Sequence, residues 1–341
     1  MAKTRESNVE LLRIVLMTMI LLSHLLTHGK FELPEFKGTY SIQDSALLSF
    51  TRYHVNTFII ISGFFGISLK FQKIFSFVIM ILFWTIIGAI IDYSFFKESA
   101  IYHIITSLIN PFTSGWFIIQ YFALMLYAPL LNKGIKALSN HQFIAIMIIF
   151  LAYIYGLFPI IVSASSPPTF EFMAMYLIGR FINRYQSRLC TFSWPKIIIT
   201  NSMLGICLFV MVVLSRSNQL IHSRLLSNQD PIVIMMGVAL FLLFKKIRVK
   251  EAPLINAVAS GVIAAYLLTD CTLTGRWLDK WFYNNSNDNA IIMIMICLTL
   301  VALLSTLEYT RKFYFNKREL QLYSIFKVKM TTIIGQYHHM F

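Results

Sequence analysis

The chain has 341 residues, of which 57% are hydrophobic and only 13% are charged, and its net charge at pH 7 is +14. This apolar content exceeds what the core of one soluble domain of this length needs, so the composition excludes a soluble enzyme. The basic residues are spread along the chain instead of gathered in one cluster. That distribution argues against nucleic acid as a partner and favours membrane lipids.

Apolar stretches of about 20 residues, the length that crosses a hydrocarbon core as a helix, recur along the sequence. They predict an all-α fold, a polytopic transmembrane helical bundle of about ten spans, with nine or eleven as alternatives. The fourth and sixth spans are short and carry polar residues, so either could be re-entrant or lie inside the bundle. The predicted spans are residues 9–28, 53–70, 74–93, 116–131, 143–163, 169–186, 197–215, 231–247, 254–274 and 289–309.

The positions of lysine and arginine predict the orientation, because positively charged loops stay on the cytoplasmic side. If the N-terminus is cytoplasmic, most of the 29 basic residues fall in inner segments. Both termini are therefore predicted to be cytoplasmic, in a multi-pass protein of the plasma (inner) membrane. We expect residues 1–310 to form a single transmembrane domain and residues 311–341 a basic cytoplasmic tail. The first outer loop, residues 29–52, could cover an outer entrance to the bundle.

The first predicted span carries three ionisable side chains, Glu10, Arg13 and His24, and such groups are costly inside a membrane. A helix turns about 100° per residue, so Arg13 and His24 share one face, about 16 Å apart along the axis. Glu10 precedes Arg13 by three residues, a spacing that permits an ion pair. The result is a polar stripe from the cytoplasmic end to His24. The alternative is that Glu10 and Arg13 reach interfacial water and His24 hydrogen bonds to a neighbouring helix.

The sequence predicts no metal site and no bound cofactor. His24 and His28 are four residues apart, but no carboxylate or cysteine on the same helix completes a zinc ligand set. The four cysteines are scattered without the spacing of a disulfide framework or a metal site.

Polar and small residues also interrupt the second predicted span. Asn56, Ser62 and Gly63 indicate either close helix packing or a narrow slot through which a thin chain could pass. Lys70 and Lys73 follow at its cytoplasmic end, where they are either ordinary positive-inside residues or contacts for phosphate.

Two later spans hold further candidates. Trp116 and Tyr121 begin the fourth span, where aromatic residues commonly anchor a helix at the membrane interface. Tyr266 and Asp270 lie toward the outer end of the ninth span. Asp270 is either a general acid, base or binding group, or a carboxylate at the membrane edge.

Several sequence segments in these spans, taken in chain order, resemble the acyltransferase-3 family of membrane acyltransferases. They are most similar to the members that O-acetylate bacterial surface polysaccharides. The resemblance covers nearly the full chain. It includes a first span in which Arg13 and His24 are separated by ten residues and His24 follows a serine. The segments that carry it are NVELLRI with the Ser-His pair, VNTFIIISGFF, WFIIQYFALMLYAPLLN, DPIVIMMGVALFLLF and INAVASGVIAAYLLTD.

The resemblance implies transfer of an acyl group, commonly acetyl, from cytoplasmic acyl-CoA to a hydroxyl of a surface polysaccharide or lipid-linked glycan. Acetyl-CoA is then a co-substrate. His24 would be the catalytic base and Arg13 its charged partner, held by Glu10. Lys70 and Lys73 loosely match a basic element of the family that would bind acyl-CoA. The residues expected to contact the acceptor or to line the pore are Asn56, Ser62, Trp116, Tyr266 and Asp270.

Two features leave alternatives open. Thr269 stands where many members of the family have a histidine after a Tyr-Leu pair, so the acceptor side could differ in this chain. An intramembrane arginine and histidine also occur in proton or substrate relays, so the alternative function is a transporter or flippase of polysaccharide precursors. A covalent acetyl-histidine is a variant of the enzymatic mechanism. The acceptor and the acyl length stay open.

Overall fold

A computed structural model of the protein describes residues 5–31, 40–96, 116–157, 167–189, 191–215, 219–270, 272–286 and 289–338. Within these ranges the regular elements are helices and no strand occurs, which confirms the predicted all-α class. Residues 32–39 of the predicted outer loop lie outside the described residues, and residues 42–51 of that loop form the short helix α2. In chain order the elements are α1 (Ser7–Phe31), α2 (Ile42–Thr51), α3 (His54–Phe65), α4 (Phe71–Phe96), α6 (Trp116–Ala137), α7 (Asn140–Ala152), the π-helical turn η2 (Tyr153–Leu157), α9 (Pro168–Arg184), α10 (Gln186–Leu189), α11 (Trp194–Leu214), α12 (Gln219–Leu225), α13 (Pro231–Lys246), α14 (Pro253–Ala259), α15 (Val262–Asp270), α16 (Leu273–Asn285) and α17 (Ala290–His338).

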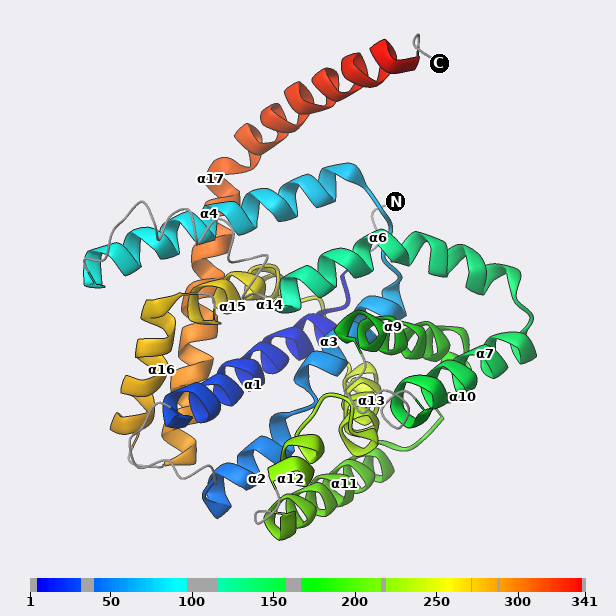
Figure 1. The fold of residues 1–341 in the computed structure, drawn as a ribbon, viewed down its shortest axis with the longest axis vertical. Coiled ribbons are helices and arrows are strands. Elements are labelled where there is room, and N and C mark those ends of the chain that lie inside the picture. Colours follow the sequence, from blue (N-terminus) through cyan, green and yellow to red (C-terminus); the bar gives the residue numbers. More distant parts are fainter. Residues whose placement is uncertain are drawn as a thin grey trace.

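Helix α1 runs through the middle of the bundle (Figure 1). It contacts helices from both halves of the chain, including α2, α3, α13, α14, α15, α16 and α17. Leu12, Leu16 and Leu26 on α1 are fully buried. A helix with apolar residues on most sides is buried among other helices, and its few polar residues then face protein. The predicted polar stripe on α1 is therefore an internal feature of the bundle.

Helices α3 and α9 pack closely through two glycines. A Cβ atom on Gly63 of α3 would lie 2.2 Å from the backbone oxygen of Tyr176, and one on Gly179 of α9 would lie 2.3 Å from that of Ile60. Small residues let helix backbones approach in this way inside membranes. Gly63 therefore serves close helix packing, which was one of the two interpretations of the second span; the other was a narrow slot. The helix ends at Phe65, before residue 70, because Gly66 takes a φ of 75° that terminates it.

Among the described residues, six helical segments are long and apolar enough to cross a membrane. They are Ser7–Gly29, Phe71–Phe95, Asn140–Leu157, Trp194–Leu214, Pro253–Asp270 and Ala290–Val328. The other four predicted spans are also helical. However, α3, α9 and α13 have 12, 17 and 16 residues, fewer than the roughly 20 that a full crossing requires. Helix α6 has 22 residues but includes Asn132, Lys133 and Lys136. The count of ten spans and the orientation of the termini remain predictions.

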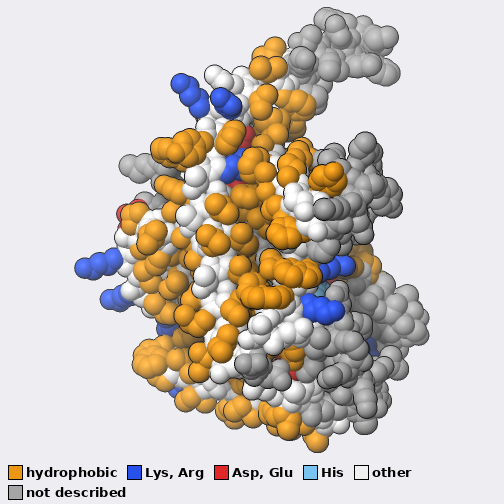
Figure 2. All heavy atoms as spheres, turned by 90° about the vertical axis from the view of Figure 1, so that its left-hand side faces the viewer, with side chains coloured by type: hydrophobic (Ala, Val, Ile, Leu, Met, Phe, Trp, Pro, Cys, Tyr) orange, Lys and Arg blue, Asp and Glu red, His pale blue; other side chains and the backbone are white. Residues whose placement is uncertain are grey.

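The outer surface fits a lipid environment. Figure 2 shows many hydrophobic side chains on the described part of the face that corresponds to the left-hand side of Figure 1, where α16 lies. On α17, Ile291, Met295 and Leu303 have exposed fractions of 73%, 56% and 57%. Soluble monomers rarely expose apolar surface on this scale. Several helices therefore present lipid-compatible faces, as expected for a multi-pass membrane protein.

Helix α17 passes residue 310 without a break, and its last part extends away from the bundle (Figure 1). Arg311 is buried and pairs with Glu308 at 2.7 Å and with Glu319 at 3.6 Å. These contacts join the two sides of the predicted boundary between membrane domain and tail. The division at residue 310 stays a prediction.

Candidate functional site

A cavity of about 610 Å³ lies beside α1 in the middle of the bundle. Its lining includes Arg13 toward the start of α1 and His28 toward its end. At 1.5 Å per residue, these positions are about 22 Å apart along the helix axis. The cavity therefore follows α1 through much of the bundle's thickness, and both Arg13 and His24 face it.

The predicted ion pair between Glu10 and Arg13 is present. Nη1 of Arg13 lies 3.1 Å from both carboxylate oxygens of Glu10, which is 6% exposed. Glu10 itself does not belong to the cavity lining, whereas Arg13 does. Since a guanidinium has five N–H donors, Arg13 keeps donors for a group inside the cavity while Glu10 holds it in position.

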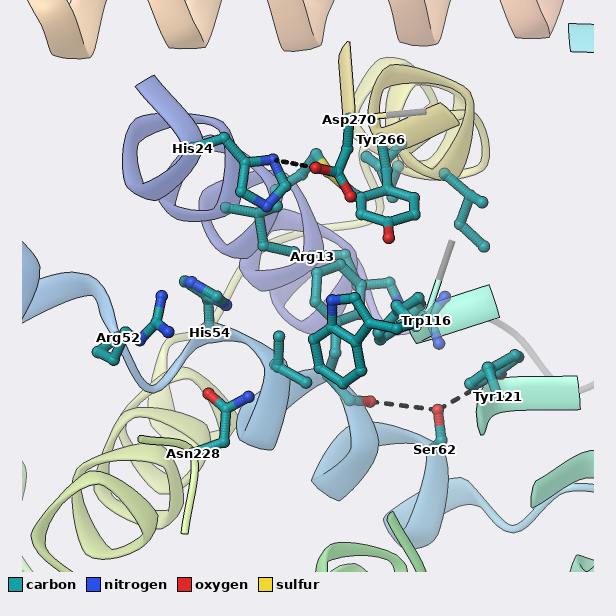
Figure 3. Close-up of a pocket in the computed structure, with 18 of the residues that line it drawn as sticks. Arg13, His24, Arg52, His54, Ser62, Trp116, Tyr121, Asn228, Tyr266 and Asp270 are labelled. Atoms are coloured by element: carbon teal, nitrogen blue, oxygen red, sulfur yellow. Dashed lines mark hydrogen bonds and ion pairs between the residues drawn. The ribbon is translucent and has the colours of Figure 1, made fainter. Parts of the chain in front are cut away.

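Asp270 of α15 lies beside His24 of α1. Its Oδ1 is 3.6 Å from Nδ1 of His24, and both side chains are mostly buried. Figure 3 shows the other ring nitrogen of His24 turned away from Asp270, toward the open centre of the cavity. A carboxylate beside Nδ1 favours the tautomer with a proton on that atom, which leaves Nε2 free to accept one. Tyr266, one turn before Asp270, places its ring 6.1 Å from that of His24.

His28 and Asp279 extend this cluster toward the end of α1. The rings of His24 and His28 are stacked, with centroids 5.1 Å apart. Nδ1 of His28 lies 3.8 Å from Oδ1 of Asp270 and 3.8 Å from Oδ2 of Asp279. Within the described part of the chain, no group of three or more histidines, cysteines and carboxylates has a metal-binding arrangement. The cluster is accordingly a set of imidazole–carboxylate contacts around His24.

The opposite wall contains polar residues that the sequence-based predictions did not include: Arg52, His54 and Asn228 (Figure 3). Arg52 donates hydrogen bonds to Ser23 Oγ and to the carbonyl of Leu226. His54 is 4% exposed, and neither of its ring nitrogens has a hydrogen-bond partner among the residues that the structure describes. A buried polar group without a partner is costly, so it often marks a place where a ligand binds. The sequence did contain one signal for His54: an ionisable residue at the start of a predicted span is a candidate for a functional site.

Several predicted residues do line the cavity. Ser62, Trp116 and Tyr121 belong to its wall, together with Tyr266 and Asp270. The hydroxyl oxygens of Ser62 and Tyr121 are 3.5 Å apart. These side chains come from α3, α6 and α15, and the lining also includes residues of α14, α16 and α17, so helices from both halves of the chain assemble the cavity around α1.

Three other predicted residues do not belong to the lining. Asn56 is buried behind the wall, where its Nδ2 donates to the backbone oxygen of Asn228 at 2.8 Å. It supports Asn228, which does line the cavity. Lys70 and Lys73 are exposed at the beginning of α4. Neither lysine lines the cavity, so the cavity does not support their suggested contact with acyl-CoA.

A family model described as an acyltransferase domain, that of the acyltransferase-3 family, matches residues 6–311. The chain belongs to the acyltransferase-3 family. No curated protein and no solved structure matches the sequence. The matched range includes the cavity-lining residues from Arg13 to Arg276. Family membership supports acyl transfer as the activity of this membrane protein, and nothing found favours the transporter alternative.

In this acyltransferase, the cavity combines two chemical features. One is a histidine with one nitrogen beside a carboxylate and the other facing open space, which is the arrangement of a general base. The other is a pair of cationic groups toward the start of α1, since Arg5, just before the helix, and Arg13 line the same cavity as His24. A long substrate with an anionic end and a reactive end would match both.

Proposed function

We propose that this protein is an O-acyltransferase that moves an acyl group, acetyl in the simplest case, from cytoplasmic acyl-CoA to a hydroxyl of an extracytoplasmic or lipid-linked surface polysaccharide. One observation carries the proposal: a single cavity connects the Arg13 end of α1 with the His24–Asp270 pair. Acyl-CoA is anionic at its nucleotide end and reactive at its thioester. The acceptor hydroxyl enters from the His28 end.

His24 acts as the general base in this mechanism. Its neutral imidazole accepts the proton of the acceptor hydroxyl while that oxygen attacks the thioester carbonyl. A C–O bond forms, the C–S bond breaks, and His24 returns the proton to the CoA thiolate. Donor and acceptor thus exchange the acyl group and one proton, and no other reactant is required. A general base contributes about 10² to 10⁴-fold to the rate.

Asp270 is a positioning residue in the same step. Its carboxylate stands 3.6 Å from Nδ1 of His24, so it fixes the tautomer and stabilises the imidazolium while the proton is held there. The hydroxyl of Tyr266 points into the cavity beside this pair (Figure 3). A donor at this place can stabilise the negative charge that develops on the carbonyl oxygen of the thioester.

The wall opposite His24 is suited to a sugar. Trp116 offers an aromatic face, and His54 and Asn228 offer polar groups next to it. Specific recognition of a polyhydroxylated ligand needs a few oriented polar groups in a largely apolar pocket. The acceptor therefore has a binding surface that faces the base across the cavity.

The test uses purified full-length protein in lipid nanodiscs with radiolabelled acetyl-CoA and chemically deacetylated surface polysaccharide from the source cells. Wild-type protein is expected to release CoA and to label the polysaccharide, and His24→Ala to lose transfer by at least about 10²-fold. His141→Ala is the matched control, because His141 is exposed on α7 away from the cavity. Transfer by folded His24→Ala at the wild-type rate would contradict the mechanism. Movement of glycan across the membrane without CoA release would contradict the proposed function.

A further inference from the structure

The cavity meets a second, more open hollow of about 480 Å³ at the end where α1 begins. Arg5, Ser260 and Lys312 line both of them, so the two spaces adjoin. The hollow is built from the start of the chain, the region of α14 and the middle of α17. It is thus an entrance through which a ligand could reach the cavity from the surface.

Two cations at this entrance are held in place by backbone carbonyls. Nη1 of Arg5 donates to the carbonyl of Asn256 at 3.1 Å, and Nζ of Lys312 donates to that of Ser260 at 2.9 Å. Lys312 also lies 3.4 Å from Oε1 of the buried Glu308. An ammonium has three donors and a guanidinium five, so both side chains keep N–H groups for the oxygens of an anionic ligand. Glu251 lines the hollow as well, and the cavity adds a further cation in Arg13.

Helix α17 presents an aromatic face beside these cations. Tyr309 and Phe313 are 49% and 76% exposed, and they line the hollow with Lys312 and Asn316. Positions 309, 312, 313 and 316 follow the spacing that places residues on one side of a helix. An aromatic face next to a cation and an amide is suited to a heterocyclic base that carries phosphate groups.

The distance from the entrance to the base fits a pantetheine arm. Asp270, the last residue of α15, follows Ser260 by ten residues, which is about 15 Å at the rise of a helix. The arm of CoA has roughly thirteen bonds between its phosphate and its sulfur, about 15 Å when extended at the length per bond of a stretched chain. A phosphate near Lys312 would therefore place the thioester beside His24 and Asp270.

We propose that this hollow binds the nucleotide end of the acyl-CoA donor, which rests on the proposed function. Arg5 and Lys312 bind its phosphates, and the face formed by Tyr309 and Phe313 stacks on its adenine. The pantetheine arm passes Ser260 into the cavity. This assigns the anionic part of the donor to α14 and α17, and not to Lys70 and Lys73.

The experiment compares two donors in nanodisc-embedded full-length protein: acetyl-CoA and S-acetyl-pantetheine, which has no nucleotide. Arg5→Gln and Phe313→Ala are each expected to raise KM for acetyl-CoA about tenfold with kcat retained, because the first loses a charge-assisted contact with phosphate and the second loses a ring that stacks on the base. With S-acetyl-pantetheine both variants should equal the wild type. The controls are Lys136→Gln, which removes another cation, and Tyr314→Ala, which removes another aromatic ring; both residues are exposed and neither lines the hollow.

A direct binding measurement separates this proposal from the proposed function. Adenosine 3′,5′-diphosphate, the nucleotide end of CoA, should bind the wild-type protein in calorimetry and bind Arg5→Gln about tenfold more weakly. Unchanged binding and unchanged KM in both variants would overturn the proposal even if acetyl transfer occurs. An increase in KM on substitution of Lys70 and Lys73 instead would also overturn it. Nucleotide binding that depends on Arg5 without acetyl transfer would support the subsite and reject the proposed reaction.

Discussion

The carboxylate of Asp270 lies 3.6 Å from Nδ1 of His24, although the two residues belong to the first helix and to a helix late in the chain. The contact exists because α1 occupies the middle of the bundle and α15 packs directly against it. An imidazole flanked by a carboxylate is oriented and can carry a proton at a lower free-energy cost. In the proposed mechanism, the pair provides a base that neither helix provides alone.

Asp270→Asn should lower kcat by about 10²-fold or more with little change in KM for acetyl-CoA, because the amide keeps the shape but loses the charge that stabilises the imidazolium. Steady-state kinetics of the nanodisc-embedded protein measure both constants. Asp92→Asn is the matched control: Asp92 is also buried and accepts hydrogen bonds from Thr274, but it does not line the cavity. A similar loss of kcat in both variants would show that the effect is structural.

Hydropathy predicts helices more reliably than it predicts their ends. The first span, residues 9–28, corresponds to α1. A long apolar segment in a membrane forms a helix because its backbone N–H and C=O groups must bond to one another. The second was predicted to continue to residue 70, whereas α3 ends at Phe65. Residues 66–70 include apolar side chains, so a hydropathy window does not detect the left-handed glycine that ends the helix. The next residue, Ile67, donates its N–H to Tyr176 of α9 and accepts a hydrogen bond from Asn132 of α6, and both contacts lie outside such a window.

The same distinction applies to the site. Helix periodicity relates Glu10, Arg13 and His24, because all three lie on one helix and their relative positions follow from 100° per residue. Whether Asp270 faces His24 depends on how α15 packs on α1, and no local pattern contains that information. Lys312 is a similar case: its sequence context is that of an ordinary basic residue after a span, yet the structure places it at the cavity entrance.

The glycine crossing of α3 and α9 predicts a stability effect. Gly63→Ala should destabilise the protein by about 1–3 kcal/mol, because the new methyl group would meet the backbone oxygen of Tyr176 and force the helices apart. Thermal unfolding in nanodiscs would show a lower Tm. Gly134→Ala on α6 is the control: a Cβ atom there has no neighbour within 4 Å, so Tm should stay the same or rise slightly. Equal Tm values for both variants would mean that α3 and α9 are not closely packed.

Thr269 should be dispensable for catalysis, although it replaces a histidine found in many members of the family. Its hydroxyl donates to the carbonyl of Ala265 within α15, and the residue does not line the cavity. Thr269→Val should therefore keep kcat near the wild-type value. Tyr266→Phe, three residues earlier and on the cavity side, should lower kcat by about 10²-fold if its hydroxyl stabilises the oxyanion. A large loss of kcat in Thr269→Val would place the acceptor on the other side of α15.

The buried ion pairs of α17 give the last prediction. Glu308 is fully buried, accepts a hydrogen bond from Trp84 Nε1 at 2.6 Å, and pairs with Arg311, which also pairs with Glu319. Arg311→Leu removes the cation that pairs with Glu319 and leaves Glu308 with only the more distant Lys312, at 3.4 Å. It should cost about 3–5 kcal/mol, seen as a large fall in Tm. Arg318→Leu is the matched control.

Arg318 lies on the same helix but is exposed, with its guanidinium 5.9 Å from the ring of Phe315. Removing it should cost no more than about 1 kcal/mol. The contrast tests whether residues beyond 310 are part of the folded bundle. If the network is formed as described, a change at Arg311 destabilises α4 as well as α17, because Glu308 also holds Trp84 of α4. Proteolysis should then cut both helices more readily in Arg311→Leu, whereas a free tail would make the two arginine variants alike.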